Sequence, residues 1–457
     1  MAKRVSQARF NAFTIGTRNW RVFTLVREVS WFSNENESLF GAVCFDFHDS
    51  DYHWILLARD EKMQFRWVDG CASIVDLATA EIELCGKIDS ISSDQIASGF
   101  GNQSDKDRQI SDLVEPIPRL SHEKMHPYFY SLANDPALLP AKSIIREMSR
   151  WLIAQDPHFK QEFQIHQFDQ RIWEIYIWAV LKEVGFEVNH ATAPDFLCSG
   201  FGFSFTVEAT TMGPSKSGAL AGINPPTNPH ELAEYQQGYL PMKFAQSLTS
   251  KLNKKHQGMH YWELPEAQGQ PFIIAIADFH SPGSMTYSQG SLHPYLYGSQ
   301  VDKIIKGGVS VVKYKPITAI EFRDKSIPAG FFKLPNAEYV SAILFSNAGT
   351  LPKFNRMGIA AGFTHSYKSM NRVGRKYNLD PNSIEGTPFT ADVLSSDYKE
   401  LWRNEVVIYH NPNAIHPIPL DALPDLLHVL EADGRIFTVN SDGKIISSIT
   451  NGVLVMP

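Results

Sequence analysis

Glu174 is an acidic residue in a segment where a charge is costly. Residues 169–184 are apolar on nearly every side, which is typical of a buried helix. A carboxylate in such a helix is unfavourable unless it forms an ion pair, takes up a proton or binds a cation. Taken alone, Glu174 is explained by an ion pair with Arg171 or Lys182.

Two further acidic residues, Asp195 and Glu208, are predicted to lie on neighbouring strands. After Gly185 the sequence predicts a strand, a turn at Ala193-Pro194 and a second strand that begins at Asp195. The segment FSFTVEATT alternates apolar and polar residues, and this period of two places Glu208 on the polar face of a strand. The separation suits two antiparallel strands joined by a tight turn, which could bring both carboxylates to one edge of a sheet.

The elements around these acids fall into three parts. Short aromatic and branched runs between Asn19 and Leu84, WRVFTLV, LFGAVCFDF, HWILLARD and MQFRWV, predict strands. The Ser-, Gly- and Asp-containing segment 90–112 is typical of an exposed linker. We therefore expect a β-rich N-terminal domain with its linker at residues 1–112, a core at 113–285 and a C-terminal α+β region at 286–457.

Within the expected core, helices and strands alternate. Helical patterns begin at Ser143 and again at Phe168, with Gly185 where a C-terminal cap would lie. A helix is also predicted from Pro241, with one apolar and one basic side. Residues 272–277 form a continuous apolar run, as expected for an interior strand that is covered on both faces.

The bulk composition excludes several classes of protein. The chain has 457 residues, 43% apolar and 20% charged, which is ordinary for a globular protein of two or three domains. No apolar run reaches the ~18 residues of a membrane span, and no secretory signal is recognisable, so we expect a cytoplasmic protein without a membrane. The four cysteines form no metal or disulfide pattern and are interpreted as core thiols.

The order of these features resembles the PD-(D/E)xK nuclease superfamily. A helix with Glu174, a strand, Pro194-Asp195 at the start of a strand, a hairpin, and then Glu208 reproduce the order of the family pattern over residues 168–280. The resemblance implies an α/β fold with a restriction-endonuclease-like mixed sheet flanked by helices. It also implies that Asp195, Glu208 and the carbonyl of Ala209 hold Mg²⁺, or Mn²⁺, and that Glu174 approaches from the helix.

One position departs from the family pattern. A lysine is expected two residues after Glu208, where it helps to activate water and to balance phosphate charge, but this chain has Thr210. Lys251 or Lys243, on the basic side of the helix from Pro241, could replace it; Lys216 is a weaker alternative. The same lysines, with Lys254, could instead belong to a solvated helix face that touches phosphate at most.

The resemblance implies a metal-dependent endonuclease that hydrolyses phosphodiester bonds. DNA is the expected substrate, with RNA left open, and a role in restriction, repair or phage defence fits the class. The formal charge of −7 argues weakly against nucleic-acid binding, so contacts with DNA would need a local basic surface. The alternative is a nuclease-like fold that has lost cleavage and binds nucleic acid or a protein partner. A homo-oligomer is compatible with either interpretation.

Overall fold

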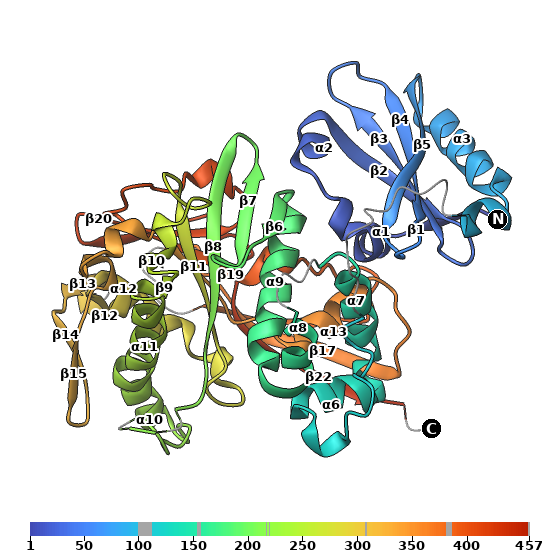
Figure 1. Ribbon diagram of the computed structural model, residues 1–457. Coiled ribbons are helices and arrows are strands. Elements are labelled where there is room, and N and C mark those ends of the chain that lie inside the picture. Colours follow the sequence, from blue (N-terminus) through green and yellow to red (C-terminus); the bar gives the residue numbers. More distant parts are fainter. Residues whose placement is uncertain are drawn as a thin grey trace.

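The computed structural model describes residues 1–98, 112–152, 157–215, 217–218, 220–306, 309–380 and 386–455. It is a mixed α/β structure with one large mixed sheet and several smaller ones (Figure 1). The coarse fold class expected from the sequence is therefore confirmed. Within the described residues, no helix is both long enough and apolar enough to cross a membrane.

The N-terminal part is an antiparallel sheet whose five strands follow one another in sequence order. They are β1 (Lys3–Val5), β2 (Val26–Ser33), β3 (Leu39–Asp46), β4 (Tyr52–Arg59) and β5 (Phe65–Ile74). Helix α3 (Leu77–Ser90) packs on the sheet through Ala80, Leu84 and Ile88. Three of the four predicted strand runs, those at β3, β4 and β5, are confirmed.

The fourth run, WRVFTLV, was wrongly predicted to be a strand. It forms helix α2 (Trp20–Leu25), because the Asn19 side chain accepts a hydrogen bond from the Arg21 N–H and caps the helix start. Most side chains of this helix are exposed, so its aromatic and branched residues do not pack in a sheet. Helix α1 (Gln7–Thr14) precedes it and is capped in the same way by Ser6.

The segment expected to be a linker begins as helix rather than loop. Helix α3 runs to Ser90 and the short α4 (Ser93–Ala97) follows, with Ser92 as its capping residue. The rest of the expected linker, 99–111, lies outside the described residues. The structure thus bears on that prediction only at residues 90–98 and 112.

A layer of helices joins the N-terminal part to the large sheet. It contains α6 (Pro127–Asn134), α7 (Leu139–Ser149), α8 (Phe159–Gln161) and the long α9 (Phe168–Val184). Helix α9 ends at Gly185, which has a φ of 111° and whose N–H reaches back to Leu181 and Lys182. The predicted helix and its glycine cap are confirmed, since a left-handed cap of this kind favours glycine.

The large sheet has the strand order β21-β20-β19-β16-β11-β8-β7-β6. Its strands are β6 (Glu187–His190), β7 (Phe196–Gly200), β8 (Phe203–Met212), β11 (Phe272–Asp278), β16 (Ala342–Ser346), β19 (Val406–His410), β20 (Leu427–Ala432) and β21 (Arg435–Val439). Strand β11 is buried and runs parallel to both β8 and β16, whereas β7 is antiparallel to β8. The predicted interior strand at 272–277 is confirmed.

Helices cover both faces of this sheet (Figure 1). Alternate residues of β11 divide between two cores: Ile273 and Ala275 face the core that contains α9, and Ile274 and Ile276 face the core that contains α11 (Leu240–Leu252). Helices α7 and α13 (Leu351–Ala360) belong to the α9 side, and α12 (Leu292–Tyr297) belongs to the α11 side. This two-sided covering explains why β11 has no polar face.

Residues after 285 complete the large sheet and add smaller sheets. Strands β16 to β21 come from this region, so the sheet continues across the expected boundary at 285. The smaller elements are α10 (Pro229–Glu234), the pair β9 (Lys255–His256) and β10 (Met259–His260), the hairpins β12 (Ser299–Lys306) with β13 (Val309–Pro316) and β14 (Ala319–Phe322) with β15 (Lys325–Pro328), and the sheet of β17 (Tyr367–Lys376), β18 (Thr387–Asp392) and β22 (Ile445–Leu454).

The cysteines were predicted to be core thiols, and this is only partly right. Cys44 and Cys198 are buried, but Cys85 is partly exposed and Cys71 is exposed. Cys71 lies near the end of β5, an edge strand, where residues 70–73 are all exposed. Cys85 lies on α3, so the two cysteines that are not buried lie on an edge strand and on a helix.

Candidate active site

Strand β8 has an open edge that begins at Glu208, and Asp195 lies beside this edge. Strand β7 pairs with β8 only as far as Phe196 opposite Val207, whereas β11 continues along β8 to Met212. From Glu208 onward, the side of β8 next to β7 therefore has no strand partner among the described residues. Backbone groups on this side are available for side chains or ligands.

Asp195 occupies that open edge. It lies one residue before β7, and its Oδ2 accepts a hydrogen bond of 2.7 Å from the Ala209 N–H. The Ala209 carbonyl faces the same side, because the N–H and C=O of one strand residue point in one direction. This carbonyl accepts a longer contact of 3.3 Å from Gln170 of α9.

The Glu208 side chain points to the face of the large sheet that α11 covers. Its side chain is 5% exposed, and its Oε1 forms an ion pair with the Nζ of Lys251, at the C-terminal end of α11. The pKa of the Tyr261 hydroxyl is raised by burial and by the nearby charges of Glu208 and Asp195, so this tyrosine stays protonated beside them. Thr210, on the same face as Glu208, brings no charge.

Glu174 approaches from α9. Its Oε1 accepts a hydrogen bond of 2.8 Å from Gln170, and its Oε2 forms an ion pair of 2.7 Å with Arg171, which also contacts Glu162. The ion pair with Arg171 expected from the sequence is present. Lys182, the other expected partner, donates instead to the carbonyl of Arg18.

We refer to Glu174, Asp195, Glu208, Arg171 and Lys251 together as the carboxylate cluster. Burial raises the pKa of Asp195, and the charges of Glu208 and Glu174 raise it further, against the opposing effects of Lys251 and the Ala209 N–H. Burial also raises the pKa of Glu174, with Arg171 opposing it and Glu208 adding to it. The pKa values of Asp195 and Glu174 are thus raised by neighbouring acids of the cluster, although two cations oppose this.

Lys251 remains charged in this setting. Burial acts to lower its pKa, but Glu208, Asp195 and Glu174 together raise it. Its ammonium carries three N–H donors, and one of them donates to Glu208 Oε1. The side chain is 24% exposed, so a ligand at the edge of β8 could reach the remaining donors.

The other lysines of this region lie elsewhere. Lys243 is buried and donates to the Gly213 carbonyl at 2.6 Å and to Ser215 at 2.8 Å, so it braces the loop after β8. Lys254 is exposed in the turn after α11. Lys216 lies outside the described residues. Of the lysines expected at the site, the structure brings Lys251 to the carboxylates.

The residues that could hold a metal ion are the two carboxylates nearest the open edge of β8, Asp195 and Glu208. No group of three or more His, Cys, Asp or Glu side chains in the described ranges is arranged to hold a metal ion. Mg²⁺, however, is usually held by one or two carboxylates and several waters. Asp195 and Glu208 carry carboxylate oxygens of that kind, and the Ala209 carbonyl faces the edge of β8 that Asp195 occupies.

Three residues near the cluster were missed by sequence reasoning. Gln170 bridges Glu174, the Ala209 carbonyl and Thr211, and its position one turn before Glu174 on α9 was a usable signal. Thr211 donates to Gln170 over 3.1 Å, and Tyr261 reaches Glu208 from a short turn after β10. No sequence pattern links Tyr261 to Glu208.

Comparisons of the chain with protein-family models, with curated proteins and with solved structures found no match.

Proposed function

We propose that this chain is a metal-dependent nuclease that hydrolyses phosphodiester bonds, with DNA as the substrate, and that the carboxylate cluster is its active site. The observation that carries the proposal is the position of Lys251. It comes from α11, yet its ammonium lies on Glu208 and within electrostatic reach of Asp195 and Glu174. The chain thereby has a lysine next to its acids although the strand has Thr210.

Each residue of the cluster has a distinct task in this proposal. Asp195 and Glu208, with the Ala209 carbonyl, hold the cation, and the Ala209 N–H orients Asp195. When bound, a divalent cation supplies positive charge at the phosphate and lowers the pKa of a water molecule. Lys251 adds a fixed positive charge for the phosphate as negative charge develops on it. Arg171 and Gln170 keep Glu174 turned toward the site.

We also propose a cellular role. A cytoplasmic enzyme of restriction, repair or phage defence fits the reaction class.

A cleavage assay tests the proposal. Purified wild type would be incubated with plasmid, linear DNA, single-stranded DNA and RNA, with Mg²⁺, with Mn²⁺ or with chelator. We expect cleavage that chelator abolishes and that Asp195→Asn lowers by roughly a hundredfold or more, since one preorganised group typically contributes that much. Asp433→Asn, an exposed aspartate far along the chain, is the matched control. Equal cleavage by wild type and Asp195→Asn would overturn the assignment.

A second candidate function is favoured by the contacts that Glu174 already makes. Both of its oxygens already have partners, Gln170 and Arg171, and Thr210 stands where a lysine would act. These features suit a nuclease-like fold that binds nucleic acid or a protein without cutting. The cleavage assay separates the two, because such a scaffold would bind DNA but release no product with any of the metals.

A further inference from the structure

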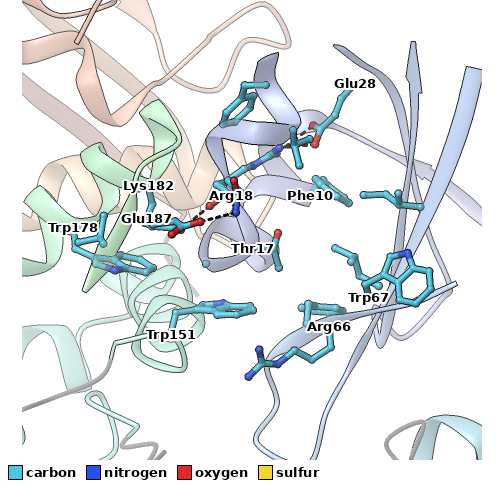
Figure 2. A pocket seen from close by; sticks show the side chains of 18 of the residues that line it. Phe10, Thr17, Arg18, Glu28, Arg66, Trp67, Trp151, Trp178, Lys182 and Glu187 are labelled. Atoms are coloured by element: carbon cyan, nitrogen blue, oxygen red, sulfur yellow. Dashed lines mark hydrogen bonds and ion pairs between the residues drawn. The ribbon is translucent and has the colours of Figure 1, made fainter. Parts of the chain in front are cut away.

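A pocket of about 580 Å³ lies between the N-terminal sheet and helix α9, and none of its lining residues belongs to the carboxylate cluster. Its walls come from β2, β4 and β5 on one side, from α9 and β6 on the other, and from the turn between α1 and α2 (Figure 2). Pockets that hold small ligands are usually roughly 300–1,000 Å³. The volume therefore suits a ligand the size of a mononucleotide.

Three tryptophans line this pocket from different elements. Trp151, after α7, and Trp178, on α9, lie on one side, and Trp67 of β5 lies on the opposite side (Figure 2). Trp151 and Trp178 are buried, whereas Trp67 is 57% exposed at the rim. Flat indole faces on two walls are suited to stacking against a planar ring such as a nucleobase.

The charged groups of the pocket are paired with one exception. Arg18 forms an ion pair with Glu28, Arg66 with Asp60, and Glu187 with Arg21. Lys182 of α9 donates a hydrogen bond of 2.6 Å to the Arg18 carbonyl, and no carboxylate in the described chain forms an ion pair with it. A buried ammonium without a counter-ion is unfavourable unless a ligand supplies one.

The condition of Lys182 agrees with a missing anion. Burial lowers its pKa to about 8, although the charge of Glu187 opposes the shift. The amine is still largely protonated at neutral pH, and two of its N–H donors remain for a ligand. An anionic group placed beside it would raise the pKa again and remove the cost of burial.

We infer that this pocket binds a nucleotide, with the base against the tryptophan rings and the phosphate beside Lys182. The Asn19 amide donates one hydrogen bond of 3.0 Å to Glu187 at the pocket wall, and its oxygen caps α2, so its second N–H is the group left for the edge of the base. The ligand can be a free mononucleotide or the terminal nucleotide of a nucleic-acid strand, since both present a planar base and a phosphate. The inference does not depend on nuclease activity.

Calorimetry and tryptophan fluorescence on the full chain test the inference. The probes are the ribonucleoside and deoxyribonucleoside monophosphates, the matching nucleosides, inorganic phosphate, and short oligodeoxynucleotides with a 5′-phosphate or a 5′-hydroxyl. We expect at least one monophosphate or 5′-phosphorylated strand to bind about tenfold or more tighter than its unphosphorylated counterpart and than phosphate, because one charge-assisted hydrogen bond accounts for about that factor. A monophosphate that binds at least as well as the strand indicates a free nucleotide, and the reverse indicates a strand end.

Two variants on opposite walls locate the binding. Lys182→Met keeps the length of the side chain and should reduce the preference for the phosphorylated probe by about tenfold. Trp67→Ala, at the exposed rim, should weaken nucleotide and nucleoside alike. Lys368→Met and Phe47→Ala, both exposed and outside the pocket, are the matched controls, and circular dichroism checks folding.

Asp195→Asn distinguishes the pocket from the proposed active site. If the nucleotide binds in the pocket, Asp195→Asn leaves its affinity unchanged while Lys182→Met or Trp67→Ala reduces it. Loss of binding in Asp195→Asn alone, or no binding preference for any phosphorylated probe, would overturn the inference. Neither result would decide whether the chain cleaves DNA.

Discussion

The carboxylate cluster and a second buried group of charges, in the C-terminal region, differ in the balance of their charges. The second group, which we call the C-terminal ion cluster, joins α13, β17 and the turn before β19, and consists of Lys353, Arg356, Arg372, Glu400 and Glu405. In it three cations surround two acids. In the carboxylate cluster two cations face three acids.

This difference sets opposite pKa directions. Burial acts to raise the pKa of Glu400, but Arg356, Lys353 and Arg372 hold it well below its usual range. The pKa values of Asp195 and Glu174 are raised, because burial and neighbouring acids prevail over their cations. Acids that the fold stabilises as anions indicate a structural network. Acids with raised pKa values indicate a site where binding of a cation or a proton is favourable.

The largest expected effect on stability comes from a variant that breaks the C-terminal ion cluster. Glu400→Gln leaves three buried cations with one carboxylate, so we expect a loss of roughly 3–5 kcal/mol in the free energy of unfolding. Chemical denaturation of wild type and variant measures it. Glu266→Gln, an exposed glutamate, should change the value by less than about 0.5 kcal/mol. A small effect of Glu400→Gln would mean that the cluster is not the structural network described.

The next effect concerns Lys251 and cleavage. Lys251→Ala should lower the rate at saturating substrate about a hundredfold, which corresponds to about 2.7 kcal/mol, because one preorganised charge at the phosphate is lost. Lys243→Ala, whose ammonium braces the Gly213 loop, should change the rate far less at saturation. If the two lysines only grip the phosphate backbone, their loss would instead weaken binding and reduce its salt dependence with the rate unchanged.

Metal binding should produce a smaller, stabilising effect. A cation that binds the folded chain at about ten times its dissociation constant adds about 1.4 kcal/mol to the free energy of unfolding. Thermal unfolding with increasing Mg²⁺ measures the gain, and Asp195→Asn should lack it. Asp433→Asn, at an exposed aspartate, is the control and should keep the full gain. A metal response that persists in Asp195→Asn would place the ion elsewhere.

The smallest effect is the pH dependence of stability without metal. A carboxyl whose folded pKa is raised binds more protons when folded, so its contribution to stability falls as pH rises above about 3.9, the usual value for Asp. Glu400 acts in the opposite direction: its depressed pKa stabilises the fold above pH of about 4.3, and this is lost on acidification.

Asp195→Asn should remove the first of these two contributions. The variant would gain up to about 1 kcal/mol at neutral pH and would lose less stability than wild type between pH of about 4 and 7. Denaturation at several pH values in chelator checks this. A variant that is less stable than wild type at neutral pH would show that Asp195 is needed as an anion for folding, through its bond to Ala209.

Local patterns in the sequence determined most elements around the proposed site. The buried helix of Glu174, its glycine end at Gly185, the alternation that places Glu208 opposite the α9 core and the interior strand β11 follow from periodicity and capping, which act over a few residues. WRVFTLV shows the limit, since this segment of strand-like composition forms a helix that Asn19 caps.

Only the tertiary structure decided which charges meet. Lys251 and Lys243 lie on one helix with similar sequence surroundings, yet Lys251 reaches Glu208 and Lys243 reaches the Gly213 loop, because the packing of α11 on β8 sets where each side chain points. The partners of Tyr261 and Lys182 come from distant segments in the same way, and so do the strands that complete the large sheet beyond residue 285. Contacts between segments far apart in sequence depend on how sheet and helices pack, and no short pattern encodes that.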